Sequence, residues 1–232
     1  MDTAIPSSSS PRLSDLEEAE AWLFDLDNTL YPASCRLFDQ VDRNITQFIM
    51  QYLSLDWQEA YKVQKTYFRE HGTSMRGMMD NHGTDPAEYL DFVHKIDLTP
   101  IDANPAMDAA LARLPGRKII FTNGSVMHAE GIMEKLGIRD HFEAIYDIVA
   151  SDYRSKPNPA VYDDLVQTHN LTPDRCVMIE DMARNLEPAA AMGMTCVWVS
   201  SENDWGREGA ENDYVHHVVD DLTDWLAQIT TN

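Results

Sequence analysis

The chain has 232 residues, 44% of them apolar and five of them tryptophan, and its 39 acidic against 18 basic side chains give a formal charge of −21. The apolar content excludes a chain without a buried core, and the length suits one large domain or one and a half ordinary ones. The negative charge repels phosphate backbones and anionic lipid, so we expect neither nucleic acid nor a membrane as a partner.

Residues 1–14 are rich in serine and proline, and we expect a mobile leader there. We see no signal-peptide pattern and no apolar run long enough to span a membrane. The three cysteines form no CxxC pair and leave one odd, which predicts reduced thiols in a cytoplasmic protein. They are Cys35, Cys176 and Cys196.

Five short runs of β-branched and aromatic residues predict buried strands. They are Trp22–Leu26, Lys118–Thr122, Ala144–Ala150, Cys176–Glu180 and Thr195–Ser200. From the second strand onward, helical patterns separate them, at Val126–Leu136, Asn158–Thr168 and Arg184–Met192. This alternation predicts an α/β fold, a Rossmann-like doubly wound parallel sheet with helices on both faces. Tyr214–Val219 could add an edge strand and Leu222–Ile229 a final helix.

The segment between the first two predicted strands is too long for a simple crossover and is strongly helical. Its first part places apolar residues on one helix face at spacings of three and four. They are Leu37, Val41, Ile45, Phe48, Ile49 and Tyr52. We therefore predict an all-helical insert at residues 34–102 and an α/β core made of residues 15–33 and 103–232.

Polar residues gather where the predicted strands end, at the edge of an open α/β sheet that usually binds ligands. They are Asp25, Asp27, Thr122, Asn123, Gly124, Lys156, Glu180 and Asp181. Each segment alone is a weak signal, but their convergence on one edge predicts a functional site.

The acids at this edge favour a metal ion. Asp25 and Asp27 are two residues apart, so in extended backbone both carboxylates can face one site. Crowded carboxylates raise one another's pKa, and Asp181 adds a third negative group. Mg²⁺ prefers hard oxygen ligands and would relieve this crowding, with Lys156 as a second compensating charge.

The other groups favour a phosphoryl ligand. Thr122 offers a hydroxyl, and the backbone N–H groups of Asn123 and Gly124 can face an anion near the start of the next helix. With a metal and a carboxylate nucleophile, these groups predict covalent catalysis through an aspartyl phosphate.

Four segments in this order, "DLDNTLYP", "TNG", "KPNP" and "EDMARN", closely resemble the signature segments of the haloacid dehalogenase-like hydrolase superfamily. The insert lies where that family carries a helical cap after the first strand. Within the family, "FDLDNTLYP", "HGTSMRGMM" and "EYLDFVHKIDL" resemble the pyrimidine 5′-nucleotidase group. The resemblance implies a Mg²⁺-dependent phosphatase that hydrolyses pyrimidine nucleoside 5′-monophosphates.

The resemblance also implies roles for the acids. Asp25 would attack phosphorus and bind the metal. Asp27 would protonate the leaving alkoxide, activate water for the second step and bind Mg²⁺ through its main-chain carbonyl. Asp181 would be the third protein ligand, with Glu180 supporting the metal, while Asn185 would orient this loop.

For the remaining residues, it implies that Thr122 and the backbone around Asn123 hold the phosphoryl oxygens and that Lys156 neutralises developing charge. Arg76 in the cap and Tyr31 near the hinge are candidates for touching the substrate. A closed cap would exclude bulk water, and its residues would choose the leaving group.

Two other functions stay open. A phosphosugar phosphatase or phosphomutase of the same fold would share every core residue. A non-catalytic binding protein on an enzyme scaffold is disfavoured by the intact set of acids and lysine. In each enzymatic case the partner is a small phosphorylated metabolite.

Several residues have simpler explanations. His216 and His217 are adjacent in a strand-like run, so they point to opposite faces and cannot both bind one metal. A methionine cluster is expected to pack inside the cap. It consists of Met75, Met78 and Met79.

Overall fold

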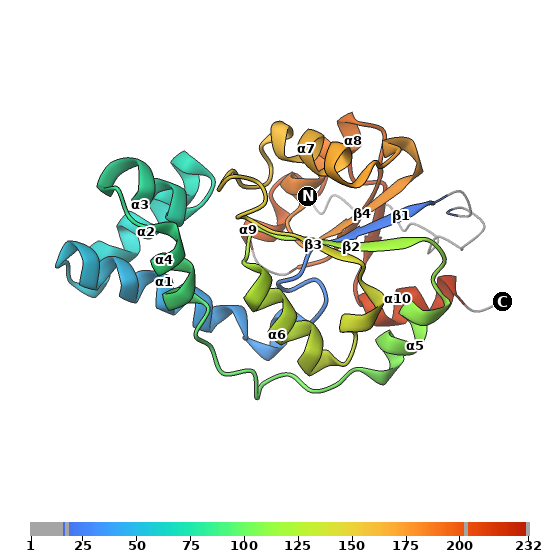
Figure 1. Cartoon of the computed structure of the whole chain (residues 1–232), viewed down its shortest axis with the longest axis horizontal. Coiled ribbons are helices and arrows are strands. Elements are labelled where there is room, and N and C mark those ends of the chain that lie inside the picture. The colour runs from blue at the N-terminus through green and yellow to red at the C-terminus, as the bar shows by residue number, and fades with distance from the viewer. Residues whose placement is uncertain (1–15, 17–18, 202–203, 231–232) are drawn as a thin grey trace, which may run out of the picture.

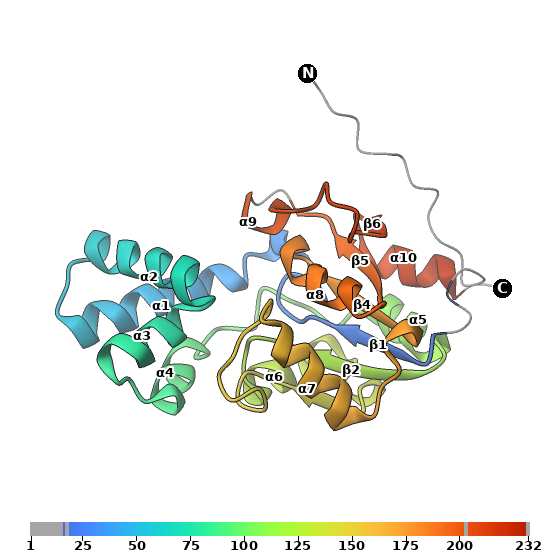
Figure 2. The same ribbon diagram turned by 90° about the horizontal axis from the view of Figure 1, so that it is seen from above.

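The computed structural model describes residues 16, 19–201 and 204–230, so the predicted leader lies outside the described residues. The described part of the chain forms a six-stranded parallel sheet with the order β3-β2-β1-β4-β5-β6 (Figures 1 and 2). The strands are β1 (Ala21–Phe24), β2 (Arg117–Phe121), β3 (Ala144–Tyr146), β4 (Cys176–Glu180), β5 (Thr195–Val199) and β6 (His217–Val219). The predicted α/β class and parallel sheet are therefore confirmed.

Helices cover both faces of the sheet, α7 and α8 above it and α5, α6 and α10 below it in Figure 1. Along β1, Trp22 and Phe24 enter one apolar cluster with α5, α6 and α10, whereas Leu23 enters the other with α7 and α8. This alternation follows from the two-residue period of a strand whose faces are both buried. The α-helices are α1 (Phe38–Leu53), α2 (Trp57–His71), α3 (Ser74–His82), α4 (Pro86–Val93), α5 (Pro105–Arg113), α6 (Val126–Leu136), α7 (Pro159–His169), α8 (Glu187–Ala191), α9 (Asp204–Arg207) and α10 (Leu222–Ile229).

The helices α1 to α4 form a separate body between β1 and β2, on the left of Figures 1 and 2. They have their own apolar core, which includes the predicted packing residues Met75 and Met78, with Met79 packed against it. The next helix, α5, packs in the α/β core instead. We call α1–α4 the cap; the boundaries at 34 and 102 remain a prediction.

The cap rests against the core. Ile148 and Tyr153, from the loop after β3, join the apolar cluster of the cap. A β-carbon at Gly72, in the turn between α2 and α3, would lie 2.6 Å from the Ser155 hydroxyl oxygen. A side chain here would therefore collide with Ser155. Gly72 also has a φ of +83°, which favours glycine for a second reason. The loop that carries Lys156 is therefore in contact with the cap.

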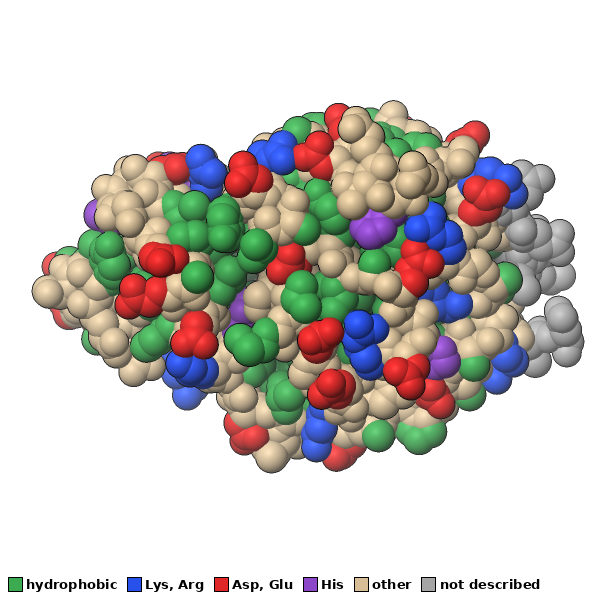
Figure 3. Space-filling view, in the orientation of Figure 1, with side chains coloured by type: hydrophobic (Ala, Val, Ile, Leu, Met, Phe, Trp, Pro, Cys, Tyr) green, Lys and Arg blue, Asp and Glu red, His purple; other side chains and the backbone are tan. Residues whose placement is uncertain are grey.

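On the face shown in Figure 3, apolar side chains gather over the cap and at its junction with the core. Acidic and basic side chains are mixed over the remainder of that face. In the part of the chain that the structure describes, we find no helix with the length and apolar character needed to cross a membrane.

Four of the five predicted strands end earlier than expected, the first at Phe24 rather than Leu26 and the second at Phe121 rather than Thr122. The third ends at Tyr146 rather than Ala150. Its neighbour Asp147 accepts hydrogen bonds from the backbone N–H groups of Val126 and Ala150, at 3.0 and 2.9 Å, and so turns the chain. The fifth ends at Val199, one residue early.

The edge strand is also shorter, and it excludes one predicted histidine. It spans His217–Val219, so His216 lies just before it. The ring Nδ1 of His216 accepts a hydrogen bond from the N–H of Cys196 in β5. The predicted helix Arg184–Met192 begins as a 3-10 turn, Ala183–Leu186, and continues as α8. All three cysteines are free.

Candidate active site

The strand register brings the predicted polar residues to one edge of the sheet. The first strand lies between β2 and β4, so Asp25, Thr122 and Asp181 each follow one of three adjacent strands. The N–H of Asp25 donates to the Ile179 carbonyl at 2.9 Å and extends the pairing of β1 by one residue. This carboxylate is therefore fixed by backbone hydrogen bonding at the end of a central strand.

Lys156 connects two of these segments. Its side chain is buried, and its ammonium group donates to Asp25 Oδ1 at 2.8 Å, to Glu180 Oε2 at 2.7 Å and to the Phe121 carbonyl at 2.7 Å. An ammonium group has three hydrogens, so these three bonds use its whole donor capacity. The loop is held in turn by Asn123, whose side-chain oxygen accepts from the Lys156 N–H at 2.9 Å.

Three buried carboxylates, those of Asp25, Glu180 and Asp181, lie close enough to share a cation. Each offers an oxygen within 4.8 Å of the others. Burial and the charge of Glu180 raise the pKa of Asp25 to about 7 despite the opposing effect of Lys156. Burial and the charges of Glu180 and Asp25 raise the pKa of Asp181 well above its usual range. Hard oxygen donors with excess buried negative charge fit Mg²⁺.

The crowding differs from the predicted one in one respect. The sequence predicts that Asp25 and Asp27 raise one another's pKa; the charge of Asp27 does raise the pKa of Asp25, but the larger charge effect comes from Glu180. The side chain of Asp27 lies outside the acidic trio and has different partners. The reason is that the chain leaves the extended conformation after Asp25 and turns through Asn28, which has a φ of +59°.

Asp27 is held by a tyrosine and a histidine. Its Oδ1 atom accepts from the Tyr31 hydroxyl at 2.6 Å and pairs with His128 Nε2 at 2.8 Å. Burial acts to raise the pKa of Asp27, but the charge and hydrogen bond of His128, with the Tyr31 hydrogen bond, outweigh it and lower that pKa. Tyr31, predicted as a possible substrate contact, is thus a direct partner of Asp27.

In the segment after β2, the structure differs from the prediction at Gly124, whose N–H bonds a side chain of the same segment rather than facing an anion. The Thr122 hydroxyl accepts from the N–H of Gly124 at 2.9 Å, and Ser125 caps the N-terminus of α6. A β-carbon at Gly124 would lie 3.1 Å from the His128 ring and 3.3 Å from the Thr122 hydroxyl. A larger residue would therefore crowd the space that faces Asp27.

Sequence reasoning missed three residues of this site. Thr29 donates to Asp25 Oδ2 at 2.9 Å. His128 bonds Asp27, and His94 stacks on His128 with ring centroids 4.3 Å apart. The position of His128 in the first turn of the helix after "TNG" could have suggested it, whereas no local pattern singles out His94.

Arg76, predicted as a possible substrate contact, forms no hydrogen bond with the acids of the site among the described residues. It lies on cap helix α3 and forms an ion pair with Asp80 on the same helix at 3.0 Å. Its predicted contact with substrate remains a prediction.

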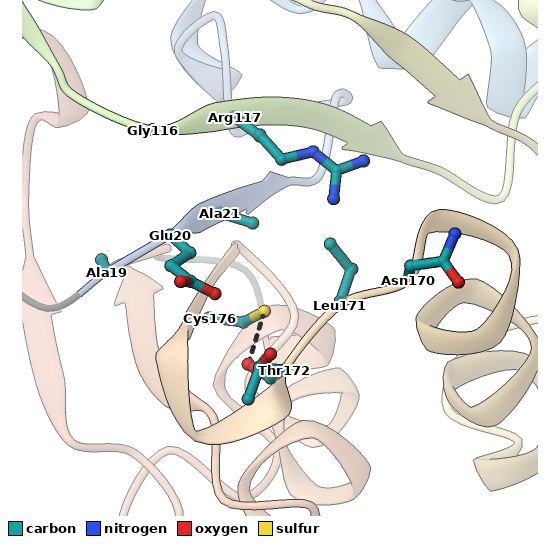
Figure 4. A pocket seen from close by; sticks show the side chains of 9 residues that line it. All are labelled: Ala19, Glu20, Ala21, Gly116, Arg117, Asn170, Leu171, Thr172 and Cys176. Carbon is teal, nitrogen blue, oxygen red and sulfur yellow. Dashed lines mark hydrogen bonds between the residues drawn. The ribbon is translucent and has the colours of Figure 1, made fainter.

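A separate cavity of about 510 Å³ lies at the other end of the sheet (Figure 4). Ala21, Arg117 and Cys176 line it, and they are the first residues of β1, β2 and β4. Its two charged side chains are already paired, Arg117 with Glu143 and Glu20 with Arg175. Because Ala21, Arg117 and Cys176 begin their strands, the cavity lies at the opposite end of the sheet from the candidate active site.

Comparison with known proteins gives a family match over most of the chain. Residues 19–193 match the model of the haloacid dehalogenase-like hydrolases. Phosphate metabolism protein 8 of Saccharomyces cerevisiae is 28% identical over 203 residues, which are 79% of this chain and 63% of the yeast protein. The chain therefore spans less than two thirds of that relative.

Two further relatives are matched along most of their length. Glyceraldehyde 3-phosphate phosphatase of Methanopyrus kandleri is 25% identical over 226 residues, covering 89% of this chain and 91% of that protein. The crystal structure of CbbY from Rhodobacter sphaeroides in complex with phosphate is 18% identical, with a TM-score of 0.60, and covers 89% of this chain and 96% of its own. This second match shows the common fold.

Proposed function

Since the chain belongs to the haloacid dehalogenase-like hydrolases, we propose that it is a Mg²⁺-dependent phosphomonoesterase acting on a small phosphorylated metabolite. One observation carries the proposal. Asp25 lies beside a buried lysine and two further carboxylates, while Asp27 is held separately by its own partners. Asp25 thus lies with the acids that would hold Mg²⁺ and Asp27 does not, so the two aspartates can take different tasks in the reaction.

In the first step, a carboxylate oxygen of Asp25 attacks phosphorus and forms an aspartyl phosphate. The ester bond to the leaving oxygen breaks, and Asp27 gives that oxygen a proton. Lys156 keeps the attacking carboxylate oriented, because it donates to Asp25 Oδ1 and is itself fixed by two other acceptors. The Thr122 hydroxyl and the backbone N–H of Asn123 would receive the phosphoryl oxygens.

In the second step, water attacks the phosphorus of the aspartyl phosphate, and Asp27 accepts its proton. The products are inorganic phosphate and free Asp25. Asp25 and Asp181 would hold Mg²⁺, with Glu180 in support, and the main-chain carbonyl of Asp27 would be a further ligand. When bound, Mg²⁺ neutralises the buried acids and the phosphoryl charge.

Within this reaction class, we favour a phosphorylated sugar or triose as substrate. The support is the relation to a glyceraldehyde 3-phosphate phosphatase along 91% of its length. A pyrimidine nucleoside 5′-monophosphate is the second candidate, supported by the resemblance of segments 71–79 and 88–98 to that group. Of the relatives reported above, the glyceraldehyde 3-phosphate phosphatase is the one named for its substrate, and it favours the sugar phosphate.

Phosphate release across a panel tests both levels of the proposal. We expect turnover of 4-nitrophenyl phosphate with Mg²⁺ and none after EDTA. The panel then compares triose, pentose and hexose phosphates with UMP, CMP, dTMP, AMP and GMP, and a preference for the sugar esters supports the narrower proposal. Failure of the folded protein to release phosphate from any ester overturns the phosphatase function.

A further inference from the structure

Both donors to Asp27 bind the same oxygen. The Tyr31 hydroxyl lies 2.6 Å and the His128 Nε2 atom 2.8 Å from Oδ1. A carboxylate oxygen has two lone pairs in its plane, so two donors fill the hydrogen-bonding capacity of Oδ1. An ionised carboxylate only accepts, so Nε2 of His128 carries a hydrogen in this pair. As long as both donors stay in place, a proton taken up by Asp27 goes to the other oxygen, Oδ2.

The second oxygen faces the anion-binding segment. A β-carbon built on Gly124 would lie 3.8 Å from Asp27 Oδ2 and 3.3 Å from the hydroxyl of Thr122. Of the two oxygens of Asp27, Oδ2 is therefore the nearer to Gly124 and to the segment that carries the proposed phosphoryl ligand Thr122.

The His128 ring is itself fixed by the cap. Its side chain is 1% exposed, and His94 stacks on it with an interplanar angle of 12°. The Nδ1 atom of His94 is in turn 2.9 Å from the Ser125 hydroxyl, and His94 is the C-cap residue of cap helix α4. The orientation of Asp27 is therefore connected to the position of the cap through two stacked rings.

We propose that Tyr31 and His128 are positioning residues that make Oδ2 of Asp27 the proton-transferring oxygen, with His94 holding the His128 ring. The inference rests on the proposed phosphatase function. In the first step the P–O ester bond breaks, its electron pair moves to the leaving oxygen, and the proton on Oδ2 moves to that oxygen. In the second step the attacking water returns a proton to Oδ2.

Leaving-group dependence separates positioning from a general structural effect. The 4-nitrophenolate group leaves without a proton, whereas the alkoxide of benzyl phosphate needs one, and the two esters are similar in shape. Both are assayed by kcat/KM, which reports the first step. Against wild type, we expect His128→Ala to lower kcat/KM about tenfold more for benzyl phosphate than for 4-nitrophenyl phosphate, a part of what general acid catalysis supplies.

Tyr31→Phe removes a single oxygen and is the variant to use if His128→Ala does not fold. We expect it to lower kcat/KM selectively for benzyl phosphate as well. His94→Ala should show this selective loss too, while His94→Phe, which keeps a ring for the stack, should restore the wild-type ratio. His141→Ala is the matched control, because it removes another histidine paired with an aspartate, Asp108, at 2.6 Å but outside the site.

Equal losses for both esters in His128→Ala and Tyr31→Phe overturn the positioning roles while leaving the phosphatase function intact. A selective loss in His141→Ala overturns them as well. No turnover of either ester by the wild type overturns the phosphatase function first and the positioning roles with it.

Discussion

The ammonium group of Lys156 lies 2.8 Å from Oδ1 of Asp25, although 131 residues separate the two in sequence. The lysine side chain is 1% exposed and the aspartate side chain 9%. The pair links the end of the first strand to the loop before α7, and it orients the carboxylate that we propose as nucleophile.

Replacing the nucleophile tests its role directly. Asp25→Asn keeps the size of the side chain but removes its charge, so we expect the rate of phosphate release to fall by at least about three orders of magnitude. Folding should be retained, because the raised pKa of Asp25 shows that its charge is costly in the metal-free protein. Steady-state kinetics and a thermal melt check both points. Wild-type-like turnover would falsify the nucleophile assignment.

Replacing Lys156 should destabilise the protein strongly. Lys156→Met leaves Asp25 and Glu180 buried without their cation, and loss of one partner from a buried ion pair costs about 3–5 kcal/mol. Urea unfolding measures the change. The control is Lys95→Ala, which breaks an exposed ion pair with Asp91 and should cost about 0.5 kcal/mol or less. Equal losses of unfolding free energy in both variants would contradict a stabilising role for the buried ion pairs of Lys156.

Binding of Mg²⁺ should stabilise the protein more at pH 8 than at pH 5.5. The folded-state pKa of Asp25 is raised from 3.8 to about 7, so between these values the folded state binds more protons than the unfolded state. The stability of the metal-free protein therefore falls as pH rises through this window. Because Mg²⁺ needs ionised ligands, its stabilising effect grows over the same range.

Thermal melts with and without Mg²⁺ at the two pH values measure this difference. Asp181→Asn removes a proposed ligand and should abolish most of the shift in Tm. Asp108→Asn, which changes an acid outside the site, should preserve it. A shift of the same size at both pH values would speak against metal binding by these acids.

A ring contact joins the cap to the core and should limit cap motion. The rings of Phe68 in α2 and Trp205 in α9 are 5.4 Å apart, and Arg69 lies over the Trp205 ring at 5.1 Å. Trp205→Ala removes this ring contact, and we expect the loss of the contact to lower the free energy of unfolding by about 0.5–1.5 kcal/mol. We expect faster amide exchange in the turn around Gly72. Trp57→Ala, at an exposed position of the same cap helix, should leave that exchange unchanged.

The sequence was sufficient to predict the parallel sheet and the acids at its carboxyl edge. A strand buried on both faces is a continuous apolar run, and the polar residue that ends it is visible directly, as at Asp25 and Asp181. Because the strands are parallel, their carboxyl ends meet at one edge, so the convergence with Lys156 follows from the alternation of strands and helices. The roles of these residues in the reaction remain predictions.

Residue patterns alone decided that this chain forms a parallel sheet with an acidic carboxyl edge, since strand periodicity and strand ends are local properties. Only the tertiary structure decided which side chain meets which. Asp27 pairs with His128, 101 residues away, because the first turn of α6 lies over the end of β1 and the chain leaving the cap places His94 on that ring. Such pairings depend on how separate helices pack, and no spacing within one segment records them.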